Sequence, residues 1–367
     1  MKFTCAQEDL AAALSMVQRA ISNNNTLPVL NNVYLKAEGK KVFLAGTNLE
    51  ISIQASLDAK VENEGALTIP SKFLTAYVPL LGSGNIEFSP VSGNALKIKS
   101  PGSEVDVKGI SAEEFPSTPK LDDPQLFSLP RKEFAQAIDQ VSFCASPNIS
   151  RPVLTGVYMS LSGAVLKLAA TDSYRLSEKE LKLKEDTGLN ISFILPSKTA
   201  QELAKILLVN EEGVVEVKLT KGKVLFKIDG VELLSRLIDG SFPEYERIIP
   251  ESSKAVVTLS CAEFALGIKK VALIVREANN NLRLRLEAGK IHLFGEETQL
   301  GKGSVEFQVN YQGDSVETAL NAQYLLDVLS HIGDAKLNLS LNDGLSPVKI
   351  APEKPSGYTH IIMPLKV

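Results

Sequence analysis

The chain of 367 residues contains few of the residues that build metal sites, disulfide frameworks and nucleophilic active sites. Its cysteines, Cys5, Cys144 and Cys261, form no CxxC pair and are odd in number, so the sequence predicts neither a zinc site nor a disulfide framework. The three histidines show no HExxH or other metal-ligand spacing. Ser173, in the stretch ATDSY, has no histidine placed to activate it. We therefore expect no catalytic site, no metal and no cofactor.

Long apolar runs and an excess of one charge are also missing. No window approaches 18 uninterrupted apolar residues, and the start, MKFTCAQEDL, turns acidic before an apolar run develops. We expect a cytoplasmic protein that does not partner a membrane. A net charge of −4 with 44% hydrophobic residues excludes a disordered acidic tail protein and gives no overall basic signature for nucleic acid. Any affinity for phosphate must come from a local patch.

What the chain does have is a long-period repeat. An apolar stripe with helical spacing occurs near the start and returns twice, each time followed by two strand-like runs around a glycine. The turn glycines, Gly39, Gly163 and Gly289, predict a β-hairpin in each copy. The stripes are Leu10, Leu14 and Val17; Phe134, Ile138 and Val141; and Phe264, Ile268 and Val271.

A second helix follows each hairpin. The letters PSK begin it at 70–72 and at 196–198, and Asn321-Ala322-Gln323 takes their place in the third copy. We expect Pro70 and Pro196 in the first helical turn, where the missing N–H costs nothing, with the adjacent serine as a cap. Two more strand-like runs then close each copy.

The repeated unit therefore predicts an α+β domain in which two helices pack on antiparallel sheets. Periodicity lapses at STPKLDDPQ and PESSKA, where Pro, Asp and Ser cluster. We expect three tandem domains, with the lengths typical of independent folding units, at 1–125, 126–253 and 254–367.

Basic side chains recur on these helical segments. Taken singly, they are typical of solvated helix faces. Equivalent helices from three copies could instead line one surface and concentrate a charge that the whole-chain sum hides, and both interpretations stay open. The residues are Arg19, Lys72, Arg131, Lys132, Lys198, Lys205, Lys269 and Lys270.

The chain also carries a specific set of motifs: LPVL at 27–30, RPVLTG at 151–156, ATDSYRL at 170–176, DGSFPEYERIIP at 239–250 and a terminal IIMPLKV. With the three tandem copies, these motifs resemble the bacterial sliding clamp family, the beta subunit of the replicative DNA polymerase holoenzyme. The resemblance covers the whole chain. It implies a closed homodimeric ring of clamp domains, with helices inside and sheets outside, that encircles double-stranded DNA independently of sequence and catalyses nothing itself. Weak, salt-sensitive phosphate contacts would permit such a ring to slide.

The resemblance further implies that the clamp loader, DNA polymerase subunits and other replication and repair proteins dock through short linear peptides in an apolar groove. Taken alone, Leu176, Ile248 and Ile361 could equally be core residues. An apolar terminus with a methionine suits an adaptable peptide site. The matching positions are Leu154, Thr171, Ser173, Tyr174, Arg175, Leu176, Pro243, Arg247, Ile248, Ile361, Met363, Pro364, Leu365 and Lys366.

Some positions depart from the family pattern. Asn24 stands where a basic loop residue often occurs, whereas Arg151 matches a basic loop position and joins the expected DNA-facing set. Lys366 replaces the more usual arginine and loses its bidentate pairing. For the expected head-to-tail dimer, in which the third domain of one chain meets the first domain of the other, the candidate anchors are Leu273 and Ile274, with Val107 as a possible facing residue. A clamp-like paralogue that serves as a peptide- or drug-binding scaffold without DNA loading is the alternative.

Overall fold

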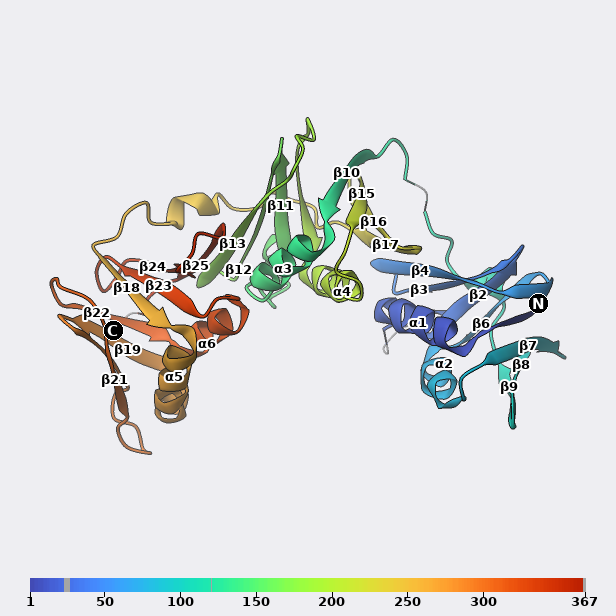
Figure 1. Ribbon diagram of the computed structural model, residues 1–367, viewed down its shortest axis with the longest axis horizontal. Helices are drawn as coiled ribbons and strands as arrows, with labels where there is room; N and C mark the ends of the chain where they lie inside the picture. The colour runs from blue at the N-terminus through green and yellow to red at the C-terminus, as the bar shows by residue number, and fades with distance from the viewer. Residues whose placement is uncertain (23–26, 120, 366–367) are drawn as a thin grey trace. The chain divides into compact units, whose positions relative to one another are not determined.

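The computed structural model describes residues 1–22, 27–119 and 121–365. Asn24 and Lys366 therefore lie outside the described residues. The chain forms two compact units, one built from Met1–Lys132 with Lys205–Leu237 and the other from Glu133–Ala204 with Ile238–Val367. In each unit helices pack on antiparallel sheets (Figure 1).

The order of helices and strands repeats along the chain. The first copy contains β1 (Lys2–Ala6), α1 (Gln7–Val17), β2 (Asn32–Glu38), β3 (Lys41–Thr47), β4 (Ile51–Asp58), β5 (Lys60–Asn63), β6 (Gly65–Pro70), α2 (Ser71–Tyr77), β7 (Asn85–Val91), β8 (Ala95–Ser100) and β9 (Ser103–Lys108). The second contains β10 (Gln125–Pro130), α3 (Arg131–Ser142), β11 (Gly156–Ser162), β12 (Val165–Thr171), β13 (Arg175–Lys182), β14 (Asn190–Pro196), α4 (Ser197–Leu207), β15 (Val214–Thr220), β16 (Lys223–Ile228) and β17 (Val231–Arg236). The third contains β18 (Ala255–Ser260), α5 (Cys261–Val275), β19 (Asn281–Glu287), β20 (Lys290–Phe294), β21 (Ser304–Gln308), β22 (Val316–Asn321), α6 (Ala322–His331), β23 (Lys336–Leu341), β24 (Val348–Pro352) and β25 (Tyr358–Ile362).

The strands of the second copy are divided between two eight-stranded sheets. In the first unit the order is β10-β15-β16-β17-β4-β3-β2-β6, beside a five-stranded sheet β5-β1-β7-β8-β9. In the second unit it is β14-β11-β12-β13-β25-β24-β23-β18, beside a four-stranded sheet β21-β20-β19-β22. The copies are joined where β17 pairs with β4 and β13 pairs with β25. The second pairing sets Leu176 opposite Ile361, which builds the site described below.

The apolar stripes predicted from the sequence are confirmed as the core-facing sides of α1, α3 and α5. All of their residues are buried. Helix α1 packs on β3 and β4, and α5 packs on α6 (Figure 1). The predicted hairpins are also confirmed, since β2–β3, β11–β12 and β19–β20 turn at Gly39, Gly163 and Gly289 with positive φ, a conformation that favours glycine.

The expected position of the two prolines is wrong by one residue. Pro70 ends β6 and precedes α2 as its N-cap residue, where no side chain caps the helix. Pro196 likewise ends β14, and both strands lie at sheet edges, where a missing N–H is tolerated. Helix α6, the second helix of the third copy, does have a side-chain cap. Asn321 accepts hydrogen bonds from the backbone N of Gln323 and Tyr324 at 2.9 and 3.3 Å.

Neither a membrane-spanning helix nor a metal-binding cluster is found among the described residues. No helix there is both long enough and apolar enough to cross a membrane. No group of three His, Cys, Asp or Glu side chains in the same residues could hold a metal ion.

Candidate functional site

The turn between β12 and β13 is fixed by its own side chains. Thr171 Oγ1 donates to the Arg175 carbonyl at 2.6 Å and accepts from Ser173 N at 3.1 Å. Asp172 Oδ1 accepts from the backbone N of Tyr174 and Arg175 at 2.9 and 3.0 Å. Ser173 takes a φ of 79°, and the Tyr174 side chain is left 63% exposed. This sequence therefore presents an aromatic ring on a rigid turn.

The Arg175 side chain ties that turn to two helices of the same unit. Its guanidinium donates to Asp172 Oδ2 at 3.0 Å, to Asp327 Oδ2 on α6 and to the Phe143 carbonyl, which follows α3. The guanidinium also lies 4.4 Å from the ring centroid of Tyr324 and 5.5 Å from that of Phe143. Arg175 thus has internal partners for its donors and acts here as a positioning residue.

Beneath the turn lies a small apolar cluster. Leu176 and Ile361, paired across β13 and β25, are fully buried and pack with Ala169 and Tyr245. In the single chain Leu176 and Ile361 are packed as core residues, and their part in a peptide groove stays a prediction. Leu154, 2% exposed in the 3-10 helix η5 (Pro152–Thr155), lies outside this cluster. The side chains of Leu154, Leu176 and Ile361 are therefore buried rather than exposed.

The exposed rim comes from the segment 239–250 and from the C-terminal tail. Pro243, Arg247 and Ile248 are exposed around the 3-10 helix η6 (Tyr245–Ile248), with Ile248 at 39%. Met363 packs on the apolar cluster, and its backbone N donates to the Tyr174 carbonyl at 2.8 Å. Leu365 N donates to the Ala319 carbonyl at 2.8 Å, and Pro364 between them is half-buried. The fold therefore brings the β12–β13 turn, η6 and the tail to one place.

Aromatic residues that sequence reasoning missed complete this place. Tyr158 stacks on Phe242 with ring centroids 5.0 Å apart, and Tyr245 meets both rings edge-on. Tyr245 donates to Glu178 Oε2 at 2.7 Å, and burial followed by this hydrogen bond raises the pKa of Tyr245. Phe242 and Tyr245 flank Pro243 in the motif FPEYERIIP, so the motif itself held the signal.

A buried polar cluster lies on the strands that carry Leu176 and Ile361. Ser177 Oγ is 2.7 Å from His360 Nδ1 and 3.2 Å from Cys144 Sγ. Burial lowers the pKa of His360 to about 3 and raises the pKa of the Cys144 thiol to about 12. At neutral pH this pair is therefore an uncharged imidazole and a protonated thiol, both buried.

The predicted basic residues are mostly exposed. Lys269 and Lys270 lie on the face of α5 opposite its buried stripe. Lys132 pairs with Glu211 at 2.6 Å, and Arg151 Nη1 donates to Ser173 Oγ at 3.0 Å. Arg19 is half-buried. The remaining exposed members of the set are Lys72, Lys198 and Lys205.

Arg131 is a correction, because it does not offer an exposed charge. Its side chain is 2% exposed, and Nη1 donates to the Asn210 carbonyl at 2.9 Å and to Asp229 Oδ2 at 2.8 Å. The hydrogen bond from Arg131 holds the pKa of Asp229 below its usual range. Asp229 occupies the β16–β17 turn with a φ of 44°, a contact 98 residues away in sequence that no helical pattern signals.

Comparison with known proteins agrees with this architecture over the whole chain. Models of the N-terminal, central and C-terminal domains of the DNA polymerase III beta subunit match residues 1–119, 128–244 and 246–366. The chain belongs to the DNA polymerase III beta subunit family. The resemblance inferred from the motifs, and the α+β fold of three tandem clamp domains, are confirmed.

Individual members of the family are distant in sequence and close in structure. The beta sliding clamp of Chlamydia pneumoniae is 29% identical over 367 residues, covering 100% of this chain and 99% of its own. The sliding clamp of Bacillus subtilis superposes with a TM-score of 0.95 at 26% identity, over 100% of this chain and 99% of that one. A sliding clamp from Pseudomonas aeruginosa, solved bound to griselimycin, has a TM-score of 0.95 at 27% identity over 100% of both chains.

The residues expected at the dimer interface of this family member differ in exposure. Leu273 is 71% exposed on α5. Ile274 is half-buried beside Gly303, where an added Cβ would lie 2.9 Å from Ile274 Cγ1. Val107, on the edge strand β9, is 8% exposed and faces the interior of its own unit. Of the three, only Leu273 presents a large apolar surface in the single chain.

Proposed function

We propose that this protein is a DNA sliding clamp, a processivity factor that encircles duplex DNA and tethers the replicative DNA polymerase. The observation that carries this function is the match of all three domains, in order, to the DNA polymerase III beta subunit. A net charge of −4 suits a ring that retains DNA by topology, because strong phosphate binding would arrest sliding. The exposed lysines on α5 and on the α2 and α4 copies supply weak, sequence-independent contacts.

The assembly that this function needs is a homodimeric ring with domain boundaries near residues 125 and 253. The ring carries no catalytic step of its own and works in the cytoplasm, where a clamp loader opens and closes it around DNA. Leu273 is the exposed apolar residue best suited to the contact between subunits. A few large anchor residues of this kind contribute most of the binding energy of an interface.

Partner proteins dock through short linear peptides on the surface made by the β12–β13 turn, η6 and the tail. Four observations support this site: an exposed Tyr174, an exposed Ile248, the half-buried Met363 and the aromatic floor of Phe242 and Tyr245. A flexible methionine beside rigid aromatic rings suits different apolar side chains in turn. Because Leu176 and Ile361 are buried, the peptide meets them only where surface side chains move aside.

Retention on circular DNA tests the proposed function directly. The protein is loaded on nicked circular duplex with a clamp loader and ATP, passed through a gel-filtration column, and compared with the same complex after a single cut. A sliding clamp stays with the circle and is lost from the linear DNA, whereas a peptide-binding paralogue without DNA loading is retained on neither. The precondition is a solution mass of twice 39.7 kDa. A monomer at micromolar concentration would contradict the ring.

A further inference from the structure

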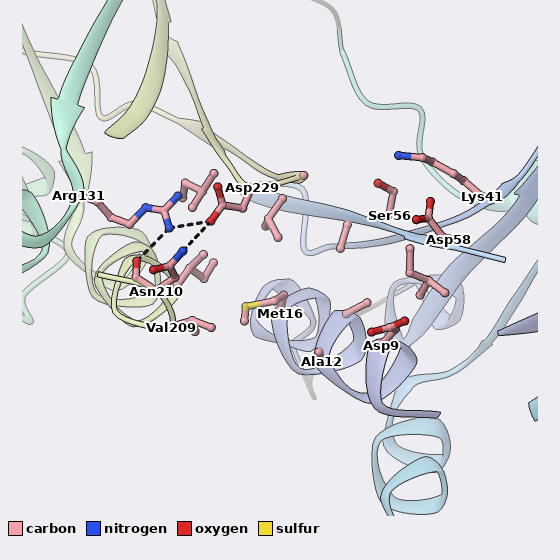
Figure 2. A pocket seen from close by; sticks show the side chains of 17 residues that line it. Asp9, Ala12, Met16, Lys41, Ser56, Asp58, Arg131, Val209, Asn210 and Asp229 are labelled. Carbon is pink, nitrogen blue, oxygen red and sulfur yellow. Dashed lines mark hydrogen bonds and ion pairs between the residues drawn. The ribbon is translucent and has the colours of Figure 1, made fainter. Parts of the chain in front are cut away.

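The first unit contains a cavity that shares no residue with the candidate peptide groove. Its volume is about 480 Å³, within the usual range of small-ligand sites. Its walls are one side of α1, the ends of β3 and β4, the loop after α4 and the β16–β17 turn (Figure 2). The proposed clamp function gives this cavity no role.

The middle of the cavity is apolar. Met16 and Ala12 of α1 line it together with Ile206 and Val209 at the end of α4. Val209 is 65% exposed, so it already presents apolar surface to solvent. A methionine in such a wall can repack around side chains of different shape.

At one polar end of the cavity the charged side chains are paired with each other. Arg131 and Asp229 pair there, and Asn210 Nδ2 donates to Asp229 Oδ2 at 3.4 Å (Figure 2). The Nε of Arg131 is buried and has no hydrogen-bond partner among the described residues. A neutral acceptor such as a carbonyl or hydroxyl oxygen would satisfy such a donor.

The other polar end is acidic. Asp9 and Asp58 line it as exposed side chains, and Figure 2 draws no ion pair to either within the described cavity wall. Lys41, opposite Asp58 across β3 and β4, is the one cation that lines this end in the described chain. With Asp229 already paired, the unbalanced charge is negative, which disfavours phosphate and carboxylate ligands and favours a cation.

We propose that this cavity binds a short peptide segment in which an apolar side chain stands next to a basic one. The apolar side chain packs between Met16 and Val209, and the cationic group lies at Asp9 and Asp58. The peptide carbonyl faces the Arg131 end, where it accepts a hydrogen bond. Binding is weak and salt-sensitive, because exposed charges contribute little and are screened.

The four methionines of the chain allow a test in which the cavity and the groove report separately. Met16 lines the cavity, Met363 packs at the groove, and Met159 is fully buried. Full-length protein labelled with 13C in its methionine methyl groups is titrated with acetyl-Leu-Lys-amide to millimolar concentration. We expect the Met16 signal to shift with saturation while Met159 and Met363 stay in place.

Matched peptides and variants test each part of the argument. Acetyl-Leu-Glu-amide should bind at least about threefold more weakly, as measured from the Met16 signal, because its carboxylate would lie next to Asp9 and Asp58. Asp58→Asn should lower the affinity for acetyl-Leu-Lys-amide by about threefold. The control Asp314→Asn makes the same change at an exposed site away from the cavity and should leave this affinity unchanged. Ala12→Phe, on an exposed position of α1, fills the space and should abolish the shift.

Three results would overturn the proposal. They are an unmoved Met16 signal in folded protein, equal binding of the two peptides, and a shift confined to Met363. Because none of these measurements involves DNA or the ring, failure here leaves the clamp function standing, and loss of DNA retention leaves this site standing.

Discussion

Replacing Arg131 with methionine tests whether this buried cation, unlike the lysines proposed to face DNA, acts on stability and not on DNA binding. The side chain is 2% exposed and makes two hydrogen bonds through Nη1, to Asn210 and Asp229. A hydrogen bond to a charged group contributes about 1.5–3 kcal/mol. Asp229 is 64% exposed and stays hydrated after the arginine is removed, so the cost falls below the ~3–5 kcal/mol of a broken buried pair. We expect Arg131→Met to destabilise the first unit by about 2 kcal/mol.

Hydrogen exchange measures this destabilisation without assuming two-state unfolding of a multidomain chain. Slowly exchanging amides of β15 and β16 should exchange about thirtyfold faster in Arg131→Met, following ~1.4 kcal/mol per factor of ten. Lys132→Met is the matched control. Its exposed pair with Glu211 should contribute less than about 1 kcal/mol. The salt dependence of DNA binding should be unchanged in Arg131→Met.

The same pair sets a pH dependence. The hydrogen bond from Arg131 lowers the folded-state pKa of Asp229, so its stabilisation is present above the unfolded pKa of about 3.9 and is lost as pH falls through the folded pKa. The stability difference between the wild type and Arg131→Met should stay constant from about pH 7 to 5 and narrow below about pH 4. Unchanged exchange in the variant, or a reduced salt slope for DNA binding, would refute the structural role of Arg131.

Three further predictions concern the proposed clamp. Lys269→Glu with Lys270→Glu should weaken DNA binding and lower the salt slope by about one unit for each phosphate that is no longer neutralised, and an unchanged slope would place both lysines away from DNA. Deleting residues 363–367 should leave dimer mass and melting temperature nearly unchanged but cut the affinity for a fluorescent peptide with a Gln and a Leu-Phe pair by at least about thirtyfold; equal binding would make the tail mere packing. Leu273→Ala should raise the dimer dissociation constant by at least about tenfold in sedimentation, and an unaffected dimer would remove this residue from the interface.

Local sequence patterns predicted the repeated elements of the fold because the forces that set them act over a few residues. Residues spaced like Phe264, Ile268 and Val271 fall on one side of a helix wherever that helix lies in a protein. The turn at Gly163 needs a positive φ, which favours glycine whatever surrounds it. The second and third copies of each pattern raised the repeat above coincidence. The motif DGSFPEYERIIP also contained the aromatic residues Phe242 and Tyr245, but the sequence analysis singled out only Pro243, Arg247 and Ile248 in it.

Only the tertiary structure decided which copies share a sheet and which charges are internal. The pairing of β17 with β4 and of β13 with β25 joins strands from different copies, and no local pattern specifies that partner. The sequence placed Arg131 among the DNA-facing cations and Arg175 in the peptide groove, yet they donate to Asp229 and Asp327, which lie 98 and 152 residues away. Pro70 ends the edge strand β6 instead of lying inside the helix, and this position also depends on strand pairing within the fold. Helix stripes and turns depend on neighbours along the chain, whereas the burial of a charge depends on a partner that only the folded chain brings within hydrogen-bonding distance.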